Sequence, residues 1–225
     1  MVDIKLPVGW VRCKLEDFCH INLGQSPSSD TYNDNADGLP FFQGKADFGK
    51  RFPNVKHWCS EPKKVAEQGD ILLSVRAPVG SVNISPEQCC IGRGLAALRG
   101  YCGIESLFIF YLMCFSKTEL HKRETGTTFK AITGDRLKSL PTNLPPLAEQ
   151  KRIVGKIEKL FAEVDKGIDL LKQKQAELKK YRQSVLSAAF SGKLYKTTNW
   201  PTVKLVNLTS KIGSGSTPNG GKNSY

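Results

Sequence analysis

Cationic and hydrogen-bonding side chains gather beside turn signals in the first 130 residues of the chain. This combination suits a nucleic-acid ligand, because cations hold phosphates while polar side chains reach the edges of the bases. Gln43 directly follows an apolar run, so its amide should emerge from a rigid element. For each residue taken singly, a solvated surface position is the alternative. The candidate DNA-contacting residues are Ser26, Ser28, Tyr32, Gln43, Lys45, Lys50, Arg51, Lys56, Arg76, Arg93, Thr127 and Lys130.

Sequence motifs for catalysis are missing from the chain. There is no G-x-x-x-x-G-K-[ST] loop for nucleotide phosphates. A methyltransferase needs an Asn/Asp-Pro-Pro-Tyr/Phe string to grip adenine, and residues 143–147, Asn-Leu-Pro-Pro-Leu, resemble a helix start instead. A zinc site with His57 and Cys59 is a minor alternative. We expect no catalytic residue and no metal ligand in this chain.

The positive charge is unevenly distributed along the chain. Of the net +12, residues 1–145 contribute +3 (18 Lys and Arg against 15 Asp and Glu) and residues 146–225 contribute +9 (15 against 6). Such basicity favours a polyanionic partner, most often nucleic acid. Charge alone does not decide the matter, because many of these residues would also suit the solvated face of a coiled coil.

The composition bounds the class of protein. The 225 residues suffice for one domain and an appendage or for two small domains. No apolar stretch of membrane-spanning length occurs, and the first ten residues lack the apolar run of a signal peptide. Seven cysteines without C-x-x-C spacing suggest reduced thiols. We expect a cytoplasmic protein with no membrane partner.

A heptad pattern predicts one long helix from residue 145 to residue 190, within a segment bounded at 144–192. Pro146 suits a first helical turn, and Gly192 suits a helix stop. A helix this long cannot bury its own apolar stripe, so we expect a coiled coil with a second helix. The alternative is an amphipathic helix lying on a globular core. The expected pairing residues are Val154, Ile157, Phe161, Val164, Ile168, Leu171, Leu178 and Val185.

The preceding residues, 1–143, have the pattern of one α+β domain. Apolar runs at 39–42, 71–75, 79–84 and 95–98 have the length and composition of strands, and 104–124 has helical periodicity. The fold class is therefore predicted as a mixed α/β globular domain followed by a long coiled-coil helix.

The end of the sequence repeats its beginning. Trp10, Lys14 and Leu15 match residues 200, 204 and 205 at the same spacing. After a one-residue insertion, residues 21, 24 and 27 match residues 212, 215 and 218. We expect residues 193–225 to begin a second copy of the globular domain.

Two segments of the long helix resemble a known family. Residues 144–154 and 182–194 are similar to the helical region of the specificity (S) subunits of Type I restriction–modification systems. Residues 6–10, 69–72 and 126–128 resemble the globular modules of that family, which are its target-recognition domains. The resemblance implies a non-catalytic subunit that directs methyltransferase (modification) and restriction subunits to a bipartite target in double-stranded DNA.

The resemblance also implies where cofactors and partners belong. S-adenosylmethionine, ATP and Mg would be bound by the partner subunits, and none by this chain. Family members usually carry two modules and two antiparallel helices, whereas this sequence shows one of each and the opening of another. We therefore expect a second copy to supply the second helix, giving an antiparallel coiled-coil homodimer. The rival interpretations are a coiled-coil scaffold that binds nucleic acid without sequence preference and a stand-alone enzyme.

Overall fold

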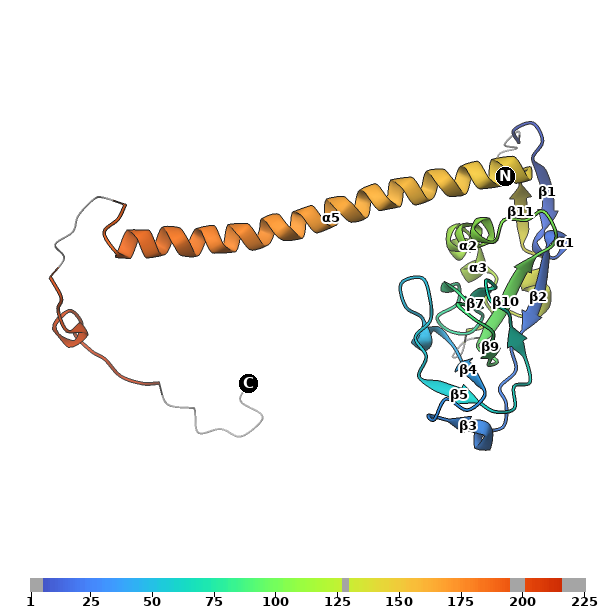
Figure 1. Cartoon of the computed structure of the whole chain (residues 1–225), viewed down its shortest axis with the longest axis horizontal. Coiled ribbons are helices and arrows are strands. Elements are labelled where there is room, and N and C mark those ends of the chain that lie inside the picture. Colours follow the sequence, from blue (N-terminus) through green and yellow to red (C-terminus); the bar gives the residue numbers. More distant parts are fainter. Residues whose placement is uncertain (1–5, 127–129, 195–200, 216–225) are drawn as a thin grey trace. The chain divides into compact units, whose positions relative to one another are not determined.

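The computed structural model describes residues 6–126, 130–194 and 201–215, and it divides into two compact units, Met1–Ala162 and Glu163–Tyr225. The first unit holds the sheets, the first turns of the long helix α5 and the short helices that precede it (Figure 1). The predicted α+β class with a long following helix is confirmed.

An antiparallel sheet of four strands forms one part of the globular domain. Its order is β2 (Cys19–Leu23), β10 (Leu95–Gly100), β7 (Ile71–Ser74) and β8 (Val82–Ile84). Three of the predicted apolar runs supply β7, β8 and β10. Helix α2 (Ser106–Phe115) packs on this sheet and buries Ile109 and Met113 in the main core. The runs are continuously apolar because both faces of β7 and most of β10 are buried.

The globular domain contains a second sheet, of five short strands that lie between residues 32 and 91. Its order is β3 (Tyr32–Asn33), β5 (His57–Cys59), β4 (Leu39–Phe42), β9 (Cys89–Ile91) and β6 (Val65–Ala66). Strand β4 matches the predicted run at 39–42. Strands β4 and β9 are parallel, with Phe42 opposite Ile91, and the other pairs are antiparallel. Two chain segments therefore leave the sheet side by side, in the same direction.

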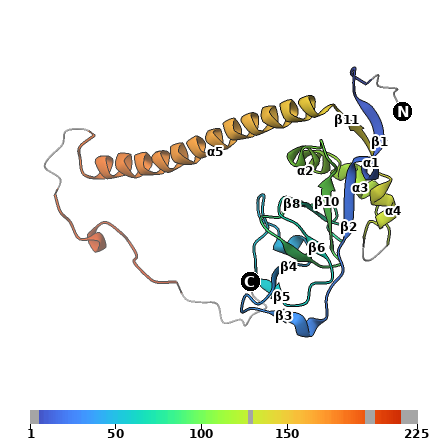
Figure 2. The same cartoon turned by 45° about the vertical axis from the view of Figure 1, so that its right-hand side comes forward.

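Short elements connect these sheets to α5. Strand β1 (Val11–Lys14) pairs with β11 (Pro141–Leu144), which runs into the start of α5 in both Figure 1 and Figure 2. The remaining short elements are α1 (Leu15–Phe18), η1 (Ser29–Thr31), η2 (Lys45–Asp47), α3 (Lys117–Lys122) and α4 (Gly134–Lys138). The single helix expected over 104–124 is two helices, because α2 ends at Phe115 and Ser116 separates it from α3, which buries Leu120.

Helix α5 spans Leu147–Phe190, close to the predicted limits. Gly192, with φ of 75°, follows it in the left-handed conformation that glycine accepts. The first compact unit extends beyond the predicted boundary at residue 143, because the first turns of α5 pack on the globular domain. Within the described residues, no helix has the length and apolarity needed to cross a membrane.

The assignment of residues 193–225 to a second domain copy stays a prediction. In its described part, a helical turn, η3 (Leu205–Asn207), opens at the residue that matches Leu15, where α1 opens. The environments differ, since Leu15 is fully buried and Leu205 is exposed.

Candidate nucleic-acid interface

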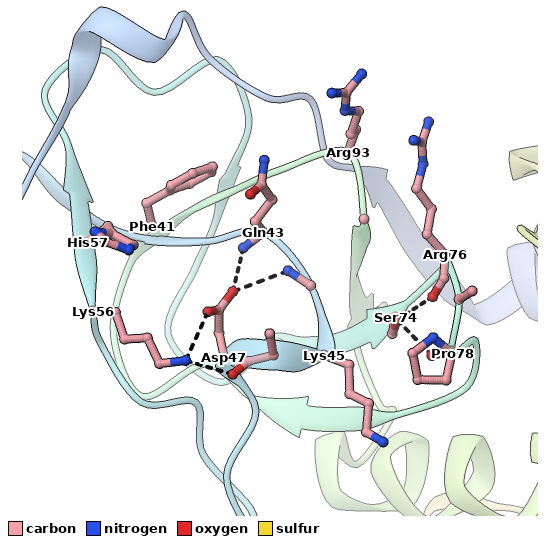
Figure 3. Close-up of a pocket in the computed structure, with 14 residues that line it drawn as sticks. Phe41, Gln43, Lys45, Asp47, Lys56, His57, Ser74, Arg76, Pro78 and Arg93 are labelled. Atoms are coloured by element: carbon pink, nitrogen blue, oxygen red, sulfur yellow. Dashed lines mark hydrogen bonds and ion pairs between the residues drawn. The ribbon is translucent and has the colours of Figure 1, made fainter. Parts of the chain in front are cut away.

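A groove of about 790 Å³ lies where three strands end (Figure 3). Gln43 follows β4, Arg93 follows β9, and Arg76 follows β7. The groove brings together five of the twelve candidate DNA-contacting residues, although they span 51 positions of sequence. They are Gln43, Lys45, Lys56, Arg76 and Arg93.

A carboxylate fixes the turn that carries Gln43. Asp47 Oδ2 accepts the backbone N–H of Gln43 at 2.8 Å and that of Gly44 at 3.2 Å. Lys56 Nζ donates to the carbonyl of Ala46 at 2.8 Å and lies 3.9 Å from the Asp47 carboxylate. Figure 3 shows Lys56 turned inward to this turn. Lys56 therefore holds the turn and neutralises its carboxylate.

Arg93 sits between two glycines that press against the Gln43 turn. A β-carbon at Gly94 would lie 2.3 Å from the carbonyl oxygen of Gln43, so only glycine fits there. The N–H of Gly92 donates to the carbonyl of Phe42 at 2.8 Å, which continues the pairing of β4 with β9. This close approach fixes the backbone of Arg93 relative to that of Gln43.

A buried serine fixes the backbone turn that carries Arg76. The Ser74 hydroxyl lies 2.9 Å from the carbonyl of Arg76 and 3.0 Å from that of Pro78. The N–H of Ala77 donates to the carbonyl of Lys130 at 2.9 Å. The turn is thereby fixed while the guanidinium remains exposed.

An aromatic side chain forms part of the lining of the groove. Phe41 lines it, and the Tyr32 ring stacks on Phe41 with centroids 4.6 Å apart. Tyr32 donates its hydroxyl to the carbonyl of Pro27 at 3.0 Å. Burial raises the pKa of Tyr32, while Arg93 and a hydrogen bond with Ser26 oppose that rise. Tyr32 and Ser26 therefore adjoin the groove as rigid neighbours.

The groove is electrically positive. Four cationic side chains line it against one carboxylate, that of Asp47. Within the described ranges, neither the Arg76 nor the Arg93 guanidinium has a carboxylate partner. Two unpaired cations at one concave surface favour a ligand that supplies its own negative charge.

Residues 7–180 match the family model described as "Type I restriction modification DNA specificity domain". The chain belongs to this family. An MjaX specificity subunit of a type I restriction enzyme from Methanocaldococcus jannaschii is 37% identical over 193 residues, covering 84% of this chain and 44% of the relative. The EcoKI specificity subunit of Escherichia coli is 28% identical, covering 87% of this chain and 45% of its own length.

Solved structures of this family share the fold. The HsdS subunit from Thermoanaerobacter tengcongensis aligns with a TM-score of 0.72 and 45% identity, over 85% of this chain and 47% of that one. A chain from a structure on complex assembly and conformational transition of the type I R-M system gives 0.75 and 46%, over 84% and 47%. The chain thus spans about half the length of the specificity subunits it matches.

Arg51, another candidate DNA contact, forms an ion pair where the globular domain meets the first turns of α5. We call this contact region the joint. Its guanidinium forms a two-pronged ion pair with Glu158, at 2.9 and 3.2 Å, and lies over the Phe110 ring at 5.9 Å. Tyr111 donates its hydroxyl to the same carboxylate at 2.5 Å. These contacts give Arg51 a packing role, and DNA contact by Arg51 stays a prediction.

The other candidates lie outside the groove. Lys130 pairs with Glu124 at 3.5 Å, and its backbone holds the Arg76 turn. Lys50 and Ser28 are exposed and do not line the groove. Thr127 lies outside the described residues.

The predicted helix-pairing residues fall into two groups. Val154 is only 8% exposed, because the globular domain covers it without a second helix. Ile157 lies half-buried beside α2, and the Phe161 ring meets the edge of Tyr111 with centroids 5.9 Å apart. Phe161 is nevertheless 57% exposed, and the remaining predicted residues are also exposed: Val164, Ile168, Leu171, Leu178 and Val185.

Sequence reasoning missed the residues that fix the groove. These residues are Asp47, Ser74 and Gly94. None of them has the long cationic or amide side chain that suggests DNA contact, and each contacts backbone atoms. The spacing Gly44–Asp47 directly after an apolar strand was the available signal for a capped turn. As for metals, the described residues contain no cluster of three or more ligating side chains, and His57 pairs with Asp34 at 2.6 Å.

Proposed function

We propose that this chain is the DNA-recognition element of a Type I restriction–modification complex, with the groove of β4, β7 and β9 contacting double-stranded DNA. The observation that carries the proposal is the positive groove in a domain of the specificity family. Family membership favours this role over a scaffold that binds nucleic acid without sequence preference. The chain would act in the cytoplasm on host DNA.

The chemistry would belong to partners of this chain. We propose that it directs methyltransferase subunits, which use S-adenosylmethionine, and a restriction subunit, which uses ATP and Mg, to one bipartite target. The chain itself would be non-catalytic and bind none of these cofactors. The relatives are specificity subunits by name, and this supports the division of labour.

Helix α5 would serve as spacer and docking surface. Its exposed residues from Val164 to Val185 occupy the heptad positions of a coiled coil, and each large apolar side chain left in water forgoes about 1.5–3 kcal/mol. We propose a second copy of this chain as the partner, in an antiparallel homodimer with two-fold symmetry. Light scattering should then give twice 24.9 kDa at tens of micromolar, and a mass of 24.9 kDa would exclude self-pairing.

Methylation mapping tests the proposed function. Adenine methylation in the host genome should vanish at one split sequence when the gene is deleted, and return when it is restored. An identical methylation map in both strains would refute the proposal. Purified chain with S-adenosylmethionine and host DNA should incorporate no methyl groups, and incorporation after removal of trace partners would refute the non-catalytic role.

A further inference from the structure

We propose that Gln43 and Arg93 form one base-contacting pair that recognises two adjacent base pairs, adenine by Gln43 and guanine by Arg93. Asp47 acts as the positioning residue for Gln43. This inference rests on the proposed function and names the residues within the groove that set its specificity.

The spacing of the two strands supports adjacency. Phe42 and Ile91 are opposite each other in the parallel β4–β9 pair, and Gln43 and Arg93 follow within two residues. Neighbouring strands lie about 4.8 Å apart, and bases on one DNA strand are stacked about 3.4 Å apart. Side chains from these two strand ends therefore suit neighbouring base pairs rather than separated ones.

The backbone under both side chains is fixed before any ligand binds. Gly94 packs against the Gln43 carbonyl so closely that a β-carbon there would lie at 2.3 Å. The Gly94 carbonyl accepts the N–H of Val75 at 2.9 Å, and the Ser26 hydroxyl lies 3.4 Å from the N–H of Arg93. A preorganised backbone lowers the entropic cost of holding two side chains in one recognition geometry.

Asp47 has a role distinct from DNA contact. Its side chain is 14% exposed and accepts the N–H groups of Gln43 and Gly44. The carboxylate thus faces the turn, with the Lys56 ammonium beside it. Without Asp47, these two backbone N–H groups lose their partner, and the direction of the Gln43 side chain is no longer fixed.

The side-chain chemistry selects the bases. A glutamine amide matches N6 and N7 of adenine, and an arginine fork matches O6 and N7 of guanine in the major groove. Within the described residues, the side chains of Gln43 and Arg93 have no hydrogen-bond partner. Figure 3 shows both extending in one direction while Lys45 extends the opposite way, so Lys45 is not part of the pair.

The test uses this chain assembled with the methyltransferase subunits of its host. Methylated motifs are sequenced for wild type, Gln43→Ala and Arg93→Ala, with Lys138→Ala, at an exposed residue of α4, as the matched surface control. Gln43→Ala should relax one A·T position and Arg93→Ala the adjacent G·C position, each losing about tenfold or more in discrimination. Lys138→Ala should leave the motif unchanged.

A variant that changes the preferred base gives a result that misfolding cannot produce. Gln43→Glu keeps the size of the side chain but only accepts hydrogen bonds, so the preferred base at that position should change from adenine to cytosine. The inference is overturned if the motif is unchanged in all variants. It is equally overturned if the Gln43 and Arg93 variants weaken every sequence alike, which would indicate phosphate contacts.

The positioning role of Asp47 has its own readout. Asp47→Ala should relax the same base pair as Gln43→Ala and leave the guanine position intact, and Asp47→Asn should partly restore the preference. A uniform loss of binding with a lowered melting temperature would reduce Asp47 to a merely structural role. If wild type methylates no discrete sequence at all, the proposed function fails, rather than this inference alone.

Discussion

The groove and the helix joint use arginine in opposite ways. In the groove, Arg76 and Arg93 rest on firmly bonded backbone, and their guanidinium groups have no carboxylate partner in the described part of the chain. At the joint, Arg51 has Glu158 and the Phe110 ring as partners. Rigid support with an unsatisfied charge favours binding, whereas a satisfied charge favours packing.

The electrostatics of the joint reinforce this difference. Hydrogen bonds from Arg51 and Tyr111 lower the pKa of Glu158, and burial together with Glu158 raises the pKa of Tyr111 to about 12. The joint is therefore a closed set of partners that anchors the first turns of α5. Changes at the joint should alter stability, and changes in the groove should alter DNA binding.

The largest expected effect comes from a buried position of α5. Val154 and Ile168 are equivalent heptad positions, but the first is 8% exposed and the second 43% exposed. Val154→Asp would bury an unpaired charge and should cost about 3 kcal/mol or more of domain stability. Thermal unfolding followed by tryptophan fluorescence measures this loss.

Ile168→Asp is the matched control for that variant. It should leave the melting of the globular domain unchanged and abolish helix pairing in sedimentation. If both variants destabilise the domain equally, the division of the stripe into a covered and an exposed part is wrong.

A smaller loss is expected at the ion pair itself. Arg51→Ala removes a pair whose side chains are 35% and 37% exposed, so solvent screening limits the cost to about 1 kcal/mol. Denaturant unfolding should show this loss, while Lys138→Ala stays within about 0.5 kcal/mol. Equal stability of Arg51→Ala and wild type would show that the pair contributes nothing to the joint.

The smallest effect is a pH dependence of stability. Because the folded-state pKa of Glu158 lies below its ordinary value of 4.5, its stabilisation is present above about pH 4.5 and is lost as the pH falls below it. The melting temperature of wild type should fall more steeply in acid than that of Glu158→Gln, by about 1–3 °C. Parallel curves for the two proteins would contradict the assigned partners.

Long patterns in the sequence predicted the large elements of the fold. The heptads gave α5 nearly to the residue, and continuous apolar runs gave β4, β7, β8 and β10, because both patterns reflect burial along one face or both. The other strands were not among the predicted runs. Strands β3, β5, β6 and β9 have only two or three residues, too few to show a period, and polar residues interrupt β1, β2 and β11. The break at Ser116 escaped because residues 116–122 contain no proline or glycine to mark it.

The sequence pointed to cations that line the groove but not to the residues that position them. Residue type and nearby turns identified the cations. By these two criteria, Arg51 and Arg93 cannot be told apart. What separates them is Glu158, 107 positions from Arg51, and a glycine contact between strands far apart in the chain. Partners brought together only by the fold leave no local signal, which is also why Asp47 was missed.

DNA binding by the assembled complex distinguishes the groove from the helix joint. The assembled complex is titrated with a duplex that carries its methylated motif, using Arg76→Ala/Arg93→Ala and Arg51→Ala in parallel. The groove variant should bind at least about tenfold more weakly, and the joint variant should stay within about twofold of wild type. Unchanged affinity for the groove variant, or an equal loss in Arg51→Ala, would contradict the assignment of the groove as the DNA-contacting surface.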